Sequence, residues 1–278
     1  MFTRRDFIKS SGLLALGSVS LPQIGCTKSV KNPGIQLYTF RKEMLENPRK
    51  TLEVIAKLGY KELESARSDK GHYYGLTAKE MKAVSKDLGL TLRSGHVHID
   101  QDWQKTVNEA AESGQEYVIC SSMPTEEQTV SNYRKTADIF NKAAEECKKN
   151  NLKFGYHNHD YEFEKVDGKV LYDILLTETD AGLVDMELDL GWVVATGNDP
   201  IAYFNKYPDR FPLWHLKDMK KEKNESTEFG KGKLNIAEMF KNGDKSGMKY
   251  FFVEQEEYLS TPEDSAKHNI EYLKNIHY

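Results

Sequence analysis

The sequence predicts a (β/α)₈ TIM barrel, a fold of the α/β class. From about residue 33 onward, helix-like segments alternate with short apolar strands, and a Gly or Asn stands near the end of most helical segments. Gly and Asn are the usual left-handed caps at helix ends. Eight alternating units favour a closed parallel barrel. An open doubly wound sheet is the alternative, which is disfavoured because no G-x-G-x-x-G motif follows the first strand.

The composition fits one barrel-sized domain, or two smaller ones. The chain has 278 residues, 38% of them hydrophobic, which is enough for a large core. The formal net charge is −4, and the body of the chain has no basic block, so a nucleic-acid surface is not expected. Cys26, Cys120 and Cys147 show neither CxxC spacing nor a disulfide framework.

Residues 1–30 resemble a twin-arginine export signal, which leaves 31–278 for the barrel. Arg4 and Arg5 precede a small apolar run at 11–21 that is too short to span a bilayer. Lipidation of Cys26 and cleavage near 18–20 are the two alternatives for processing. We therefore expect a periplasmic protein whose membrane contact would be limited to a lipid on Cys26.

Eight candidate strands can be read in chain order, at 35–38, 61–64, 91–96, 117–120, 152–159, 183–189, 213–216 and 250–254. Thr77 and Thr261 are expected helix N-caps, the second with Pro262 at the first helical position. The same helical spacing recurs between strands and in the last helix. The residues on these apolar faces are Tyr133, Ala137, Phe140, Ala144 and Cys147, and then Ala266, Ile270 and Leu273.

The fifth strand ends in two histidines, His157 and His159. Side chains two apart in an extended chain share a face, so the two imidazoles are expected side by side. Neighbouring imidazoles at a strand end are suitable metal ligands. A pair of hydrogen-bonded surface histidines is the alternative.

Polar residues stand at the end of nearly every candidate strand. In a barrel these ends meet at the face that carries the chemistry. The residues are Tyr38, Arg41, Glu64, His96, His98, Ser121, His157, His159, Asp189, Trp192, His215, Lys217, Asp218, Glu254 and Glu256. Strands five to eight supply His157 or His159 together with Asp189, His215 and Glu254. This nitrogen and oxygen set suits one Mn²⁺, Zn²⁺, Co²⁺ or Fe²⁺ better than Mg²⁺ or Ca²⁺.

At these residues the chain resembles the xylose isomerase-like barrels of the sugar phosphate isomerase/epimerase branch. The matching motifs lie in order along the chain after residue 33. They are Glu64, the Tyr156-His-Asn-His159 strand with Glu162-Phe163, Leu188-Asp189-Leu-Gly191-Trp192, His215-Leu-Lys217-Asp218, the Gly230–Gly232 turn with Leu234-Asn235, and Val253-Glu254-Gln255.

The resemblance implies one divalent metal that grips two adjacent sugar oxygens. Carried over by position, its ligands are His157, Asp189, His215 and Glu254. A Lewis acid there would acidify the carbon-bound proton of a hydroxy-ketone, which a positioned base would move. We expect the catalytic residues to be Glu254, His159, Lys217 and Glu162. The expected substrate-binding residues are Tyr38, Arg41, Glu64, His96, His98, Trp192 and Lys217.

Two departures from the family pattern bear on the reaction. Many family members end strand five with a Glu where this chain has His157, so the base here is expected to be His159, Glu162, His98 or Lys217. Three-zinc, phosphodiester-cleaving members have a His where this chain has Trp192, so a DNA-repair nuclease is not expected. Trp192 suits stacking on a sugar face, with a packing role as the alternative.

The turn Gly230-Lys-Gly232-Lys233 has two interpretations. Its backbone donors suit a phosphate, and the favoured alternative is a turn into a helix that Asn235 caps.

The sequence therefore indicates an exported, metal-dependent enzyme that acts on a sugar, keto-sugar or glycoside by abstracting a proton next to a carbonyl. Isomerisation, epimerisation and elimination of the lyase or dehydratase type stay open, with elimination favoured. The alternative is a non-catalytic, carbohydrate-binding lipoprotein. We expect a small sugar as the ligand and no nucleic acid, and a homo-oligomer stays open.

Overall fold

A closed barrel of eight parallel strands forms the centre of residues 29–278, the part of the chain that the computed structural model describes. The predicted fold is confirmed. The predicted export signal and Cys26 lie outside the described residues, apart from the last two positions of the 1–30 segment. The barrel strands are β1 (Gly34–Gln36), β2 (Glu62–Ser65), β3 (Thr91–Val97), β4 (Tyr117–Cys120), β5 (Lys153–His157), β8 (Val184–Asp189), β9 (Leu213–Leu216) and β12 (Tyr250–Val253).

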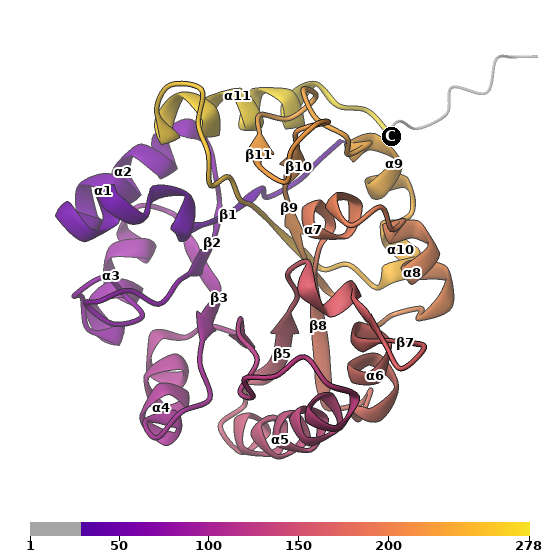
Figure 1. The fold of residues 1–278 in the computed structure, drawn as a ribbon. Coiled ribbons are helices and arrows are strands. Elements are labelled where there is room, and N and C mark those ends of the chain that lie inside the picture. The colour runs from indigo at the N-terminus through magenta and orange to yellow at the C-terminus, as the bar shows by residue number, and fades with distance from the viewer. Residues whose placement is uncertain (1–28) are drawn as a thin grey trace, which may run out of the picture.

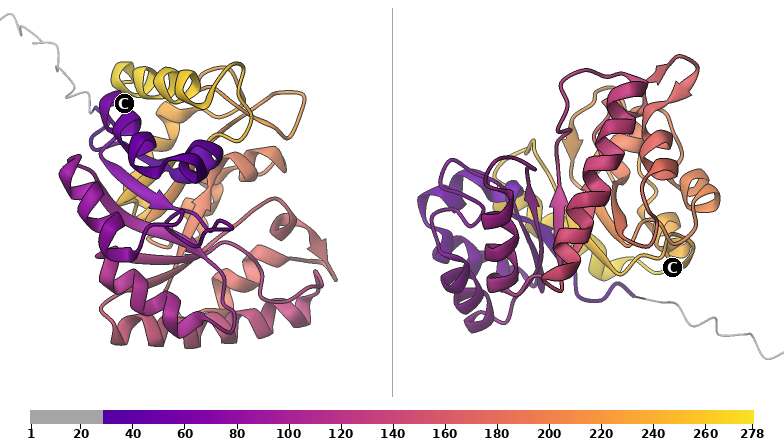
Figure 2. Two further views of the ribbon diagram at one scale, coloured as in Figure 1. Left: turned by 90° about the vertical axis from the view of Figure 1, so that its left-hand side faces the viewer. Right: turned by 90° about the horizontal axis from the view of Figure 1, so that it is seen from below.

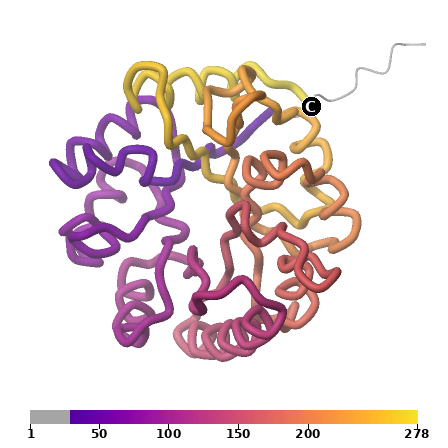
Figure 3. The backbone as a smooth tube through the Cα atoms, viewed as in Figure 1, coloured from indigo at the N-terminus to yellow at the C-terminus, as the bar shows by residue number. Residues whose placement is uncertain are grey.

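The helices form a ring outside the strands (Figure 1). They are α1 (Arg41–Glu46), α2 (Pro48–Leu58), α3 (Ala78–Asp87), α4 (Trp103–Ser113), α5 (Val130–Lys149), α6 (Leu171–Glu178), α7 (Leu190–Ala195), α8 (Pro200–Lys206), α9 (Ile236–Lys241), α10 (Gly243–Ser246) and α11 (Pro262–Asn275). The chain passes once around the barrel in sequence order (Figure 3). Because β1 pairs with β12 as well as with β2, the ring closes.

Two short antiparallel ribbons extend beyond the strand ends. One joins β6 (Lys165–Val166) to β7 (Lys169–Val170), and the other joins β10 (Asp218–Met219) to β11 (Ser226–Thr227). At the other end, Ser29 forms an isolated bridge with His277, so the two ends of the described chain lie side by side (Figure 2). No helix among residues 29–278 is long and apolar enough to cross a membrane.

The predicted helix signals are confirmed. Thr77 accepts a hydrogen bond from the Glu80 backbone N–H, and the Glu80 carboxylate accepts one from the Thr77 backbone, so the pair forms a capping box. Thr261 caps α11, with Pro262 in its first turn. The apolar faces predicted for α5 and α11 are buried.

The first strand is shorter than predicted. It ends at Gln36, and Leu37–Phe40 form a 3₁₀ helix, η2, instead of continuing the strand to residue 38. The Gln36 side chain explains this change, because its oxygen accepts a hydrogen bond from the Tyr38 backbone N–H and its Nε2 donates to Glu64. Tyr38 consequently lies on a turn at the rim, where 38% of its surface is exposed.

The inside of the barrel is layered. Tyr117, Ile119, Leu213 and Phe252 form a buried apolar cluster separate from the main core. Side chains two residues further along a strand point to the same face. His215 and Glu254 therefore lie one layer above Leu213 and Phe252, toward the carboxyl ends of the strands. The alternation of side chains along the strands therefore places a polar layer, with His215 and Glu254, directly above an apolar layer, with Leu213 and Phe252.

Candidate active site

Seven buried acidic and imidazole side chains converge at the carboxyl ends of the barrel strands. Each is at most 8% exposed, and they come from six barrel strands, with Glu254 standing directly after the last of these. They are Glu64, His96, His157, Glu187, Asp189, His215 and Glu254. Buried groups of this kind are costly unless each is paired with another charge or with a cation.

Three imidazoles surround one oxygen of Glu187. The distances to Glu187 Oε2 are 2.8 Å from His96 Nε2, 3.3 Å from His157 Nδ1 and 3.3 Å from His215 Nε2. Glu187 is fully buried on β8, two residues before Asp189 on the same face of the strand. The carboxylate oxygen is thus at the centre of a nitrogen-rich cluster.

His215 connects this cluster to two further carboxylates. Its Nε2 lies 2.6 Å from Glu64 Oε1, and its Nδ1 lies 2.9 Å from Glu254 Oε2. Glu64 also accepts hydrogen bonds from Gln36 Nε2 and from the Ser94 hydroxyl group. Glu64 is therefore part of the buried support and does not line the cavity.

Lys217 supplies a fixed positive charge. Its Nζ lies 3.0 Å from Asp189 Oδ2, 2.8 Å from Glu254 Oε2 and 2.6 Å from Glu256 Oε1. Burial alone would lower the pKa of Lys217, but these three carboxylates raise it well above its ordinary value. The side chain stays protonated and does not suit the role of a base that the sequence suggested for it.

The histidines differ in protonation. Burial and the neighbouring His215 lower the pKa of His157 well below its ordinary value. Burial and the charge of Lys217 lower the pKa of His159 to about 4. Burial would also lower the pKa of His96, but Glu64 and Glu187 raise it to about 9. At neutral pH, His157 and His159 are therefore neutral imidazoles.

A cavity of about 240 Å³ opens above these groups. His159 lies at its wall, with Nδ1 3.4 Å from the Tyr161 hydroxyl group, whereas His157 lies in its floor and is 2% exposed. The lining residues are Tyr38, Ala66, Arg67, His96, His98, Ser121, His157, His159, Lys217, Glu254 and Glu256.

The donor set is one that can hold a divalent cation. His157 Nδ1 and Glu187 Oε1 are buried and make no hydrogen bond in the described structure, and Asp189 Oδ2 makes none apart from its ion pair with Lys217. Donor atoms of His96, His157, Glu187 and His215 lie within 4.8 Å of one another, as do those of Asp189, His215 and Glu254. Unsatisfied buried nitrogen and oxygen atoms are costly on their own and are suited to binding a cation.

The family model for the xylose isomerase-like TIM barrel matches residues 52–276. The chain belongs to this family. It is 28% identical over 158 residues to an inosose dehydratase of Clostridium beijerinckii, covering 50% of this chain and 52% of that protein. The chain spans about half the length, or less, of the curated relatives that it matches.

Solved structures with the same fold include a sugar phosphate isomerase/epimerase and the IolI protein. A sugar phosphate isomerase/epimerase of Parabacteroides distasonis is 29% identical, with a TM-score of 0.79 over 89% of this chain and 99% of that one. The IolI protein with a bound zinc atom has a TM-score of 0.69 at 14% identity, over 87% of this chain and 96% of that one. At that identity the likeness shows the fold alone.

In this xylose isomerase-like barrel, the four predicted metal ligands do converge, but in two groups. His157 lies with the Glu187 cluster, 4.0 Å from Asp189 Oδ2 through its Nε2. Asp189 and Glu254 lie on the other side of His215, around Lys217. The predicted set therefore spans two overlapping donor groups that share His215.

The predicted substrate-binding residues divide between the cavity and its surroundings. Tyr38, His96, His98 and Lys217 line the cavity. Arg41 lies beside it and donates to the Tyr38 and Glu256 carbonyl groups and to the Tyr258 hydroxyl group. Trp192 packs behind Lys217, whose Nζ is 5.0 Å from the indole ring centre.

Glu162 supports the histidine turn and does not face the cavity. It is fully buried, accepts a hydrogen bond from the Tyr156 hydroxyl group, and accepts another from the His159 backbone N–H at 2.9 Å. Burial raises the pKa of Glu162 to about 8, against the opposing effect of these hydrogen bonds. Glu162 is not among the residues that line the cavity, and its hydrogen bond to the His159 backbone suits it to holding the histidine turn.

Replacing Glu162 with glutamine should stabilise the protein at neutral and mildly alkaline pH. The folded state keeps a proton that the unfolded chain releases above the ordinary pKa of 4.5. Glu162 therefore costs stability increasingly from pH 4.5 to about 8, at most about 1.4 kcal/mol per pH unit. Urea unfolding at several pH values should show a gain for Glu162→Gln that grows across this window. A pH-independent gain, or the same trend for exposed Glu164→Gln, would contradict this assignment.

Glu187 and Arg67 belong to the site but were not among the predicted site residues. Glu187 carried a usable signal, because it precedes Asp189 by two residues in a strand and must share its face. Arg67 follows β2 and contacts the His98 Nδ1 atom. No pattern around Arg67 in the sequence marks it.

The turn at Gly230–Lys233 is filled by a carboxylate of the protein itself. Asp218 accepts hydrogen bonds from the backbone N–H groups of Gly230, Gly232 and Leu234 at 3.0, 2.9 and 3.0 Å, and from that of Met219. The Asn235 side chain caps α9. The helix-turn interpretation is therefore confirmed, and the donors that a phosphate would need are already used.

Replacing Asp218 with alanine should destabilise the barrel by about 3 kcal/mol, because it leaves several backbone donors without an acceptor. Chemical unfolding should show a clear loss in the unfolding free energy. The same change at exposed Asp87 should be nearly neutral. Equal stability of the two variants would refute the role given to the Asp218 carboxylate.

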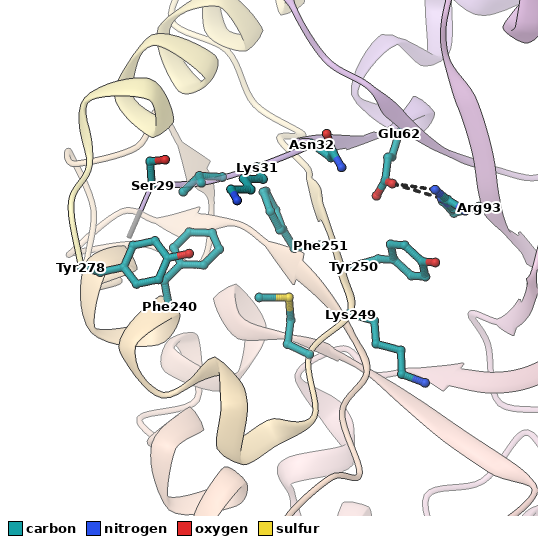
Figure 4. A pocket seen from close by; sticks show the side chains of 12 residues that line it. Ser29, Lys31, Asn32, Glu62, Arg93, Phe240, Lys249, Tyr250, Phe251 and Tyr278 are labelled. Carbon is teal, nitrogen blue, oxygen red and sulfur yellow. Dashed lines mark hydrogen bonds and ion pairs between the residues drawn. The ribbon is translucent and has the colours of Figure 1, made fainter. Parts of the chain in front are cut away.

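A second, larger cavity of about 720 Å³ lies at the opposite end of the barrel (Figure 4). It is lined by residues 29–32 before β1, by residues near the starts of β2, β3 and β12, and by Phe240 and Tyr278. It includes the ion pair between Glu62 and Arg93, with 3.1 Å between Arg93 Nη2 and Glu62 Oε1. Chemistry in this fold belongs to the carboxyl ends of the strands. The smaller cavity with its histidines is therefore the candidate active site.

Proposed function

We propose that this barrel is a divalent-metal-dependent enzyme that removes a proton next to the carbonyl group of a sugar or keto-sugar. The observation that carries the proposal is the convergence of imidazoles, carboxylates and a buried ammonium group beneath one cavity. Its similarity to an inosose dehydratase and to a sugar phosphate isomerase/epimerase supports this substrate class.

The cavity favours a small polar ligand. Its volume of about 240 Å³ lies below the roughly 300–1,000 Å³ of pockets for drug-sized molecules. Its lining carries imidazoles, two hydroxyl groups, carboxylates, an arginine and the Lys217 ammonium group. A single sugar ring, with hydroxyl groups on all sides, matches this lining better than an oligosaccharide or an apolar compound.

His159 is the best candidate for moving the proton. It lies at the cavity wall, and its imidazole is unprotonated at neutral pH because burial and Lys217 lower its pKa to about 4. Glu254 is the second candidate. Burial would raise its pKa, but Lys217 and His215 lower it well below the ordinary value, so the carboxylate is ionised.

Lys217 suits a different role. Its buried ammonium group lies at the cavity and keeps its charge, so it can stabilise negative charge that develops on a substrate oxygen. A divalent cation held by the buried histidines and carboxylates would add Lewis acidity toward substrate oxygens.

Elimination is the outcome we favour over epimerisation. His157 stands at the end of the fifth barrel strand, where the two-carboxylate arrangement of family epimerases would need a Glu. The cavity carboxylates follow β12, and the neutral His159 lies at the wall. One base there can remove the proton while a neighbouring substituent leaves. A dehydratase or a keto-glycoside lyase fits this arrangement.

A solvent-exchange screen tests the proposal. The metal-loaded protein is incubated in D₂O with free sugars, 3-keto-sugars, keto-glycosides and inososes, and deuterium is followed by NMR. We expect deuterium exchange at one carbon atom in one of these compound classes. A chelator and the His159→Gln variant should each strongly reduce the exchange rate. Sugars that stabilise the protein without any exchange would overturn the proposal and favour a carbohydrate-binding protein.

Export through the twin-arginine route is part of the same proposal and rests on residues 1–30 of the sequence. Changing Arg4 and Arg5 together to lysine should leave an unprocessed precursor in the cytoplasm, as cell fractionation would show. Unchanged export of this variant would contradict the assigned route. Mass analysis of the mature protein would decide between cleavage near 18–20 and lipidation of Cys26.

A further inference from the structure

Arg67 and His98 lie side by side at the rim of the cavity. Arg67 Nη1 is 2.5 Å from His98 Nδ1, and both residues line the cavity. Arg67 stands two residues after β2 and His98 directly after β3, so two neighbouring strands supply the pair. The proton transfer proposed for this cavity does not use the contact.

We propose that Arg67 holds His98 as a neutral imidazole with its proton on Nε2, so that His98 donates a hydrogen bond to an oxygen atom of the substrate. Arg67 is then a positioning residue, and His98 is a substrate-binding residue. The tautomer follows from the contact itself, whereas the binding role rests on the proposed function.

The direction of the hydrogen bond between the two side chains follows from their chemistry. A guanidinium group has N–H donors but no acceptor, and it stays protonated in proteins. His98 Nδ1 must therefore accept the hydrogen bond, which a ring nitrogen can do only when it carries no proton. A neutral imidazole with a bare Nδ1 carries its hydrogen on Nε2.

The charges around His98 favour the same neutral state. Burial lowers the pKa of His98, Arg67 and His96 lower it further, and Asp100 opposes them. A second positive charge beside the guanidinium group is disfavoured. Asp100 Oδ2 lies 3.5 Å from Arg67 Nη1 and thereby helps to hold the guanidinium group against the imidazole.

This tautomer removes His98 from the candidate bases. A base must present a bare nitrogen to the substrate, and in a histidine that acts as a base the other nitrogen commonly donates to a carboxylate or carbonyl group. Arg67 reverses this arrangement, because it occupies the bare nitrogen of His98. The remaining nitrogen, Nε2, has no hydrogen-bond partner among residues 29–278 and is free to donate.

The pair lies further from the buried donors than the other histidine of the same strand. His96 Nε2 is 2.8 Å from Glu187 Oε2, and His98 follows two residues later on the same face, one layer closer to the mouth of the cavity. The Arg67 side chain is 47% exposed. The pair presents only N–H donors, so it suits an accepting oxygen at the edge of a sugar, such as a ring or glycosidic oxygen.

Nitrogen NMR of the full chain labelled with ¹⁵N-histidine tests the tautomer directly. Protonated and bare ring nitrogens have different chemical shifts, and the His98→Gln spectrum identifies the His98 signals by their loss. We expect a bare Nδ1 and a protonated Nε2 at neutral pH. In Arg67→Met both signals should move toward a mixture of tautomers, whereas Arg49→Met, which changes an exposed arginine on α2, should leave them in place.

A proton on Nδ1 in the unmodified protein, or unchanged His98 signals in Arg67→Met, would overturn the inference. Either result would leave the proposed proton abstraction standing, because that reaction does not use His98.

Kinetics with the substrate found by the exchange screen test the binding role. Glutamine keeps an N–H donor near the position of Nε2, whereas leucine has none. His98→Leu should raise KM about 10-fold, as for the loss of one hydrogen bond, with little change in kcat. His98→Gln should restore most of this loss, and Arg67→Met should also act on KM.

A large fall in kcat of His98→Leu with an unchanged KM would refute the donor role and return His98 to the candidate bases. No exchange with any compound would overturn the proposed function and, with it, the binding role of His98. The nitrogen spectrum decides the tautomer in either case.

Discussion

Replacing Glu254 with glutamine should lower kcat/KM for the exchanging substrate by about 10³-fold, within the range typical of a group that takes part in proton transfer. The Glu254 carboxylate lines the cavity and contacts both Lys217 Nζ and His215 Nδ1. Glutamine keeps the shape of the side chain but loses the charge. The loss should appear mainly in kcat, because binding of a neutral sugar does not depend on that charge.

The measurement is the rate of deuterium incorporation into the substrate found by the exchange screen. Exposed Glu263→Gln on α11 is the control and should match the unmodified protein. Circular dichroism of Glu254→Gln should be native-like, because Lys217 keeps Asp189 and Glu256 as partners. Near-native turnover of Glu254→Gln would remove this residue from the reaction.

Replacing Lys217 with methionine should cost both activity and stability. The fully buried lysine is the shared partner of Asp189, Glu254 and Glu256. Removing one member of a buried ion pair typically costs about 3–5 kcal/mol, because it leaves uncompensated charge in the interior. We expect a loss in unfolding free energy of that order, together with loss of detectable exchange.

Urea unfolding of Lys217→Met beside Lys221→Met provides the comparison. Lys221 is exposed, so its replacement should change the unfolding free energy little. Equal stability of the two variants would show that the carboxylates around Lys217 do not depend on its charge. Full activity of Lys217→Met would exclude a role in stabilising negative charge on the substrate.

The barrel could be predicted from the sequence because its signals are local. Strand and helix periods, and caps such as Thr77 and Thr261, depend on residues only a few positions apart. The first strand was the exception, since its end depends on the Gln36 side chain, which bonds both the following turn and Glu64 on the neighbouring strand. That contact joins residues 28 positions apart and leaves no local pattern.

The convergence of the site was also predictable, because parallel strand ends meet at one face of a barrel. Which of these residues contact one another could not be predicted. His157 and His159 have the same local pattern, yet β5 ends at His157, and the chain then turns, so one histidine lies in the floor and the other at the wall. Glu162 was placed among the reacting groups because the sequence does not show its bond to Tyr156.

The ion pairs of Lys217 could not be predicted from the sequence either. Its neighbour in the sequence, Asp218, is the obvious partner, but the two side chains point to different places. Asp218 binds the backbone of the Gly230–Lys233 turn, and Lys217 binds three carboxylates from two other segments. Which charges pair depends on which way each strand residue faces after the barrel closes.

Metal content after equilibrium dialysis tests the central claim most directly. Residues 31–278 and a His215→Gln variant are dialysed side by side against a low concentration of Zn²⁺, and the bound metal is measured by mass spectrometry. His215 belongs to both groups of possible metal ligands, so its replacement removes a ligand from either one. We predict one zinc ion per unmodified chain and almost none in the variant. Equal zinc in the two proteins, or none in either, would contradict the claim that these buried side chains bind a divalent cation.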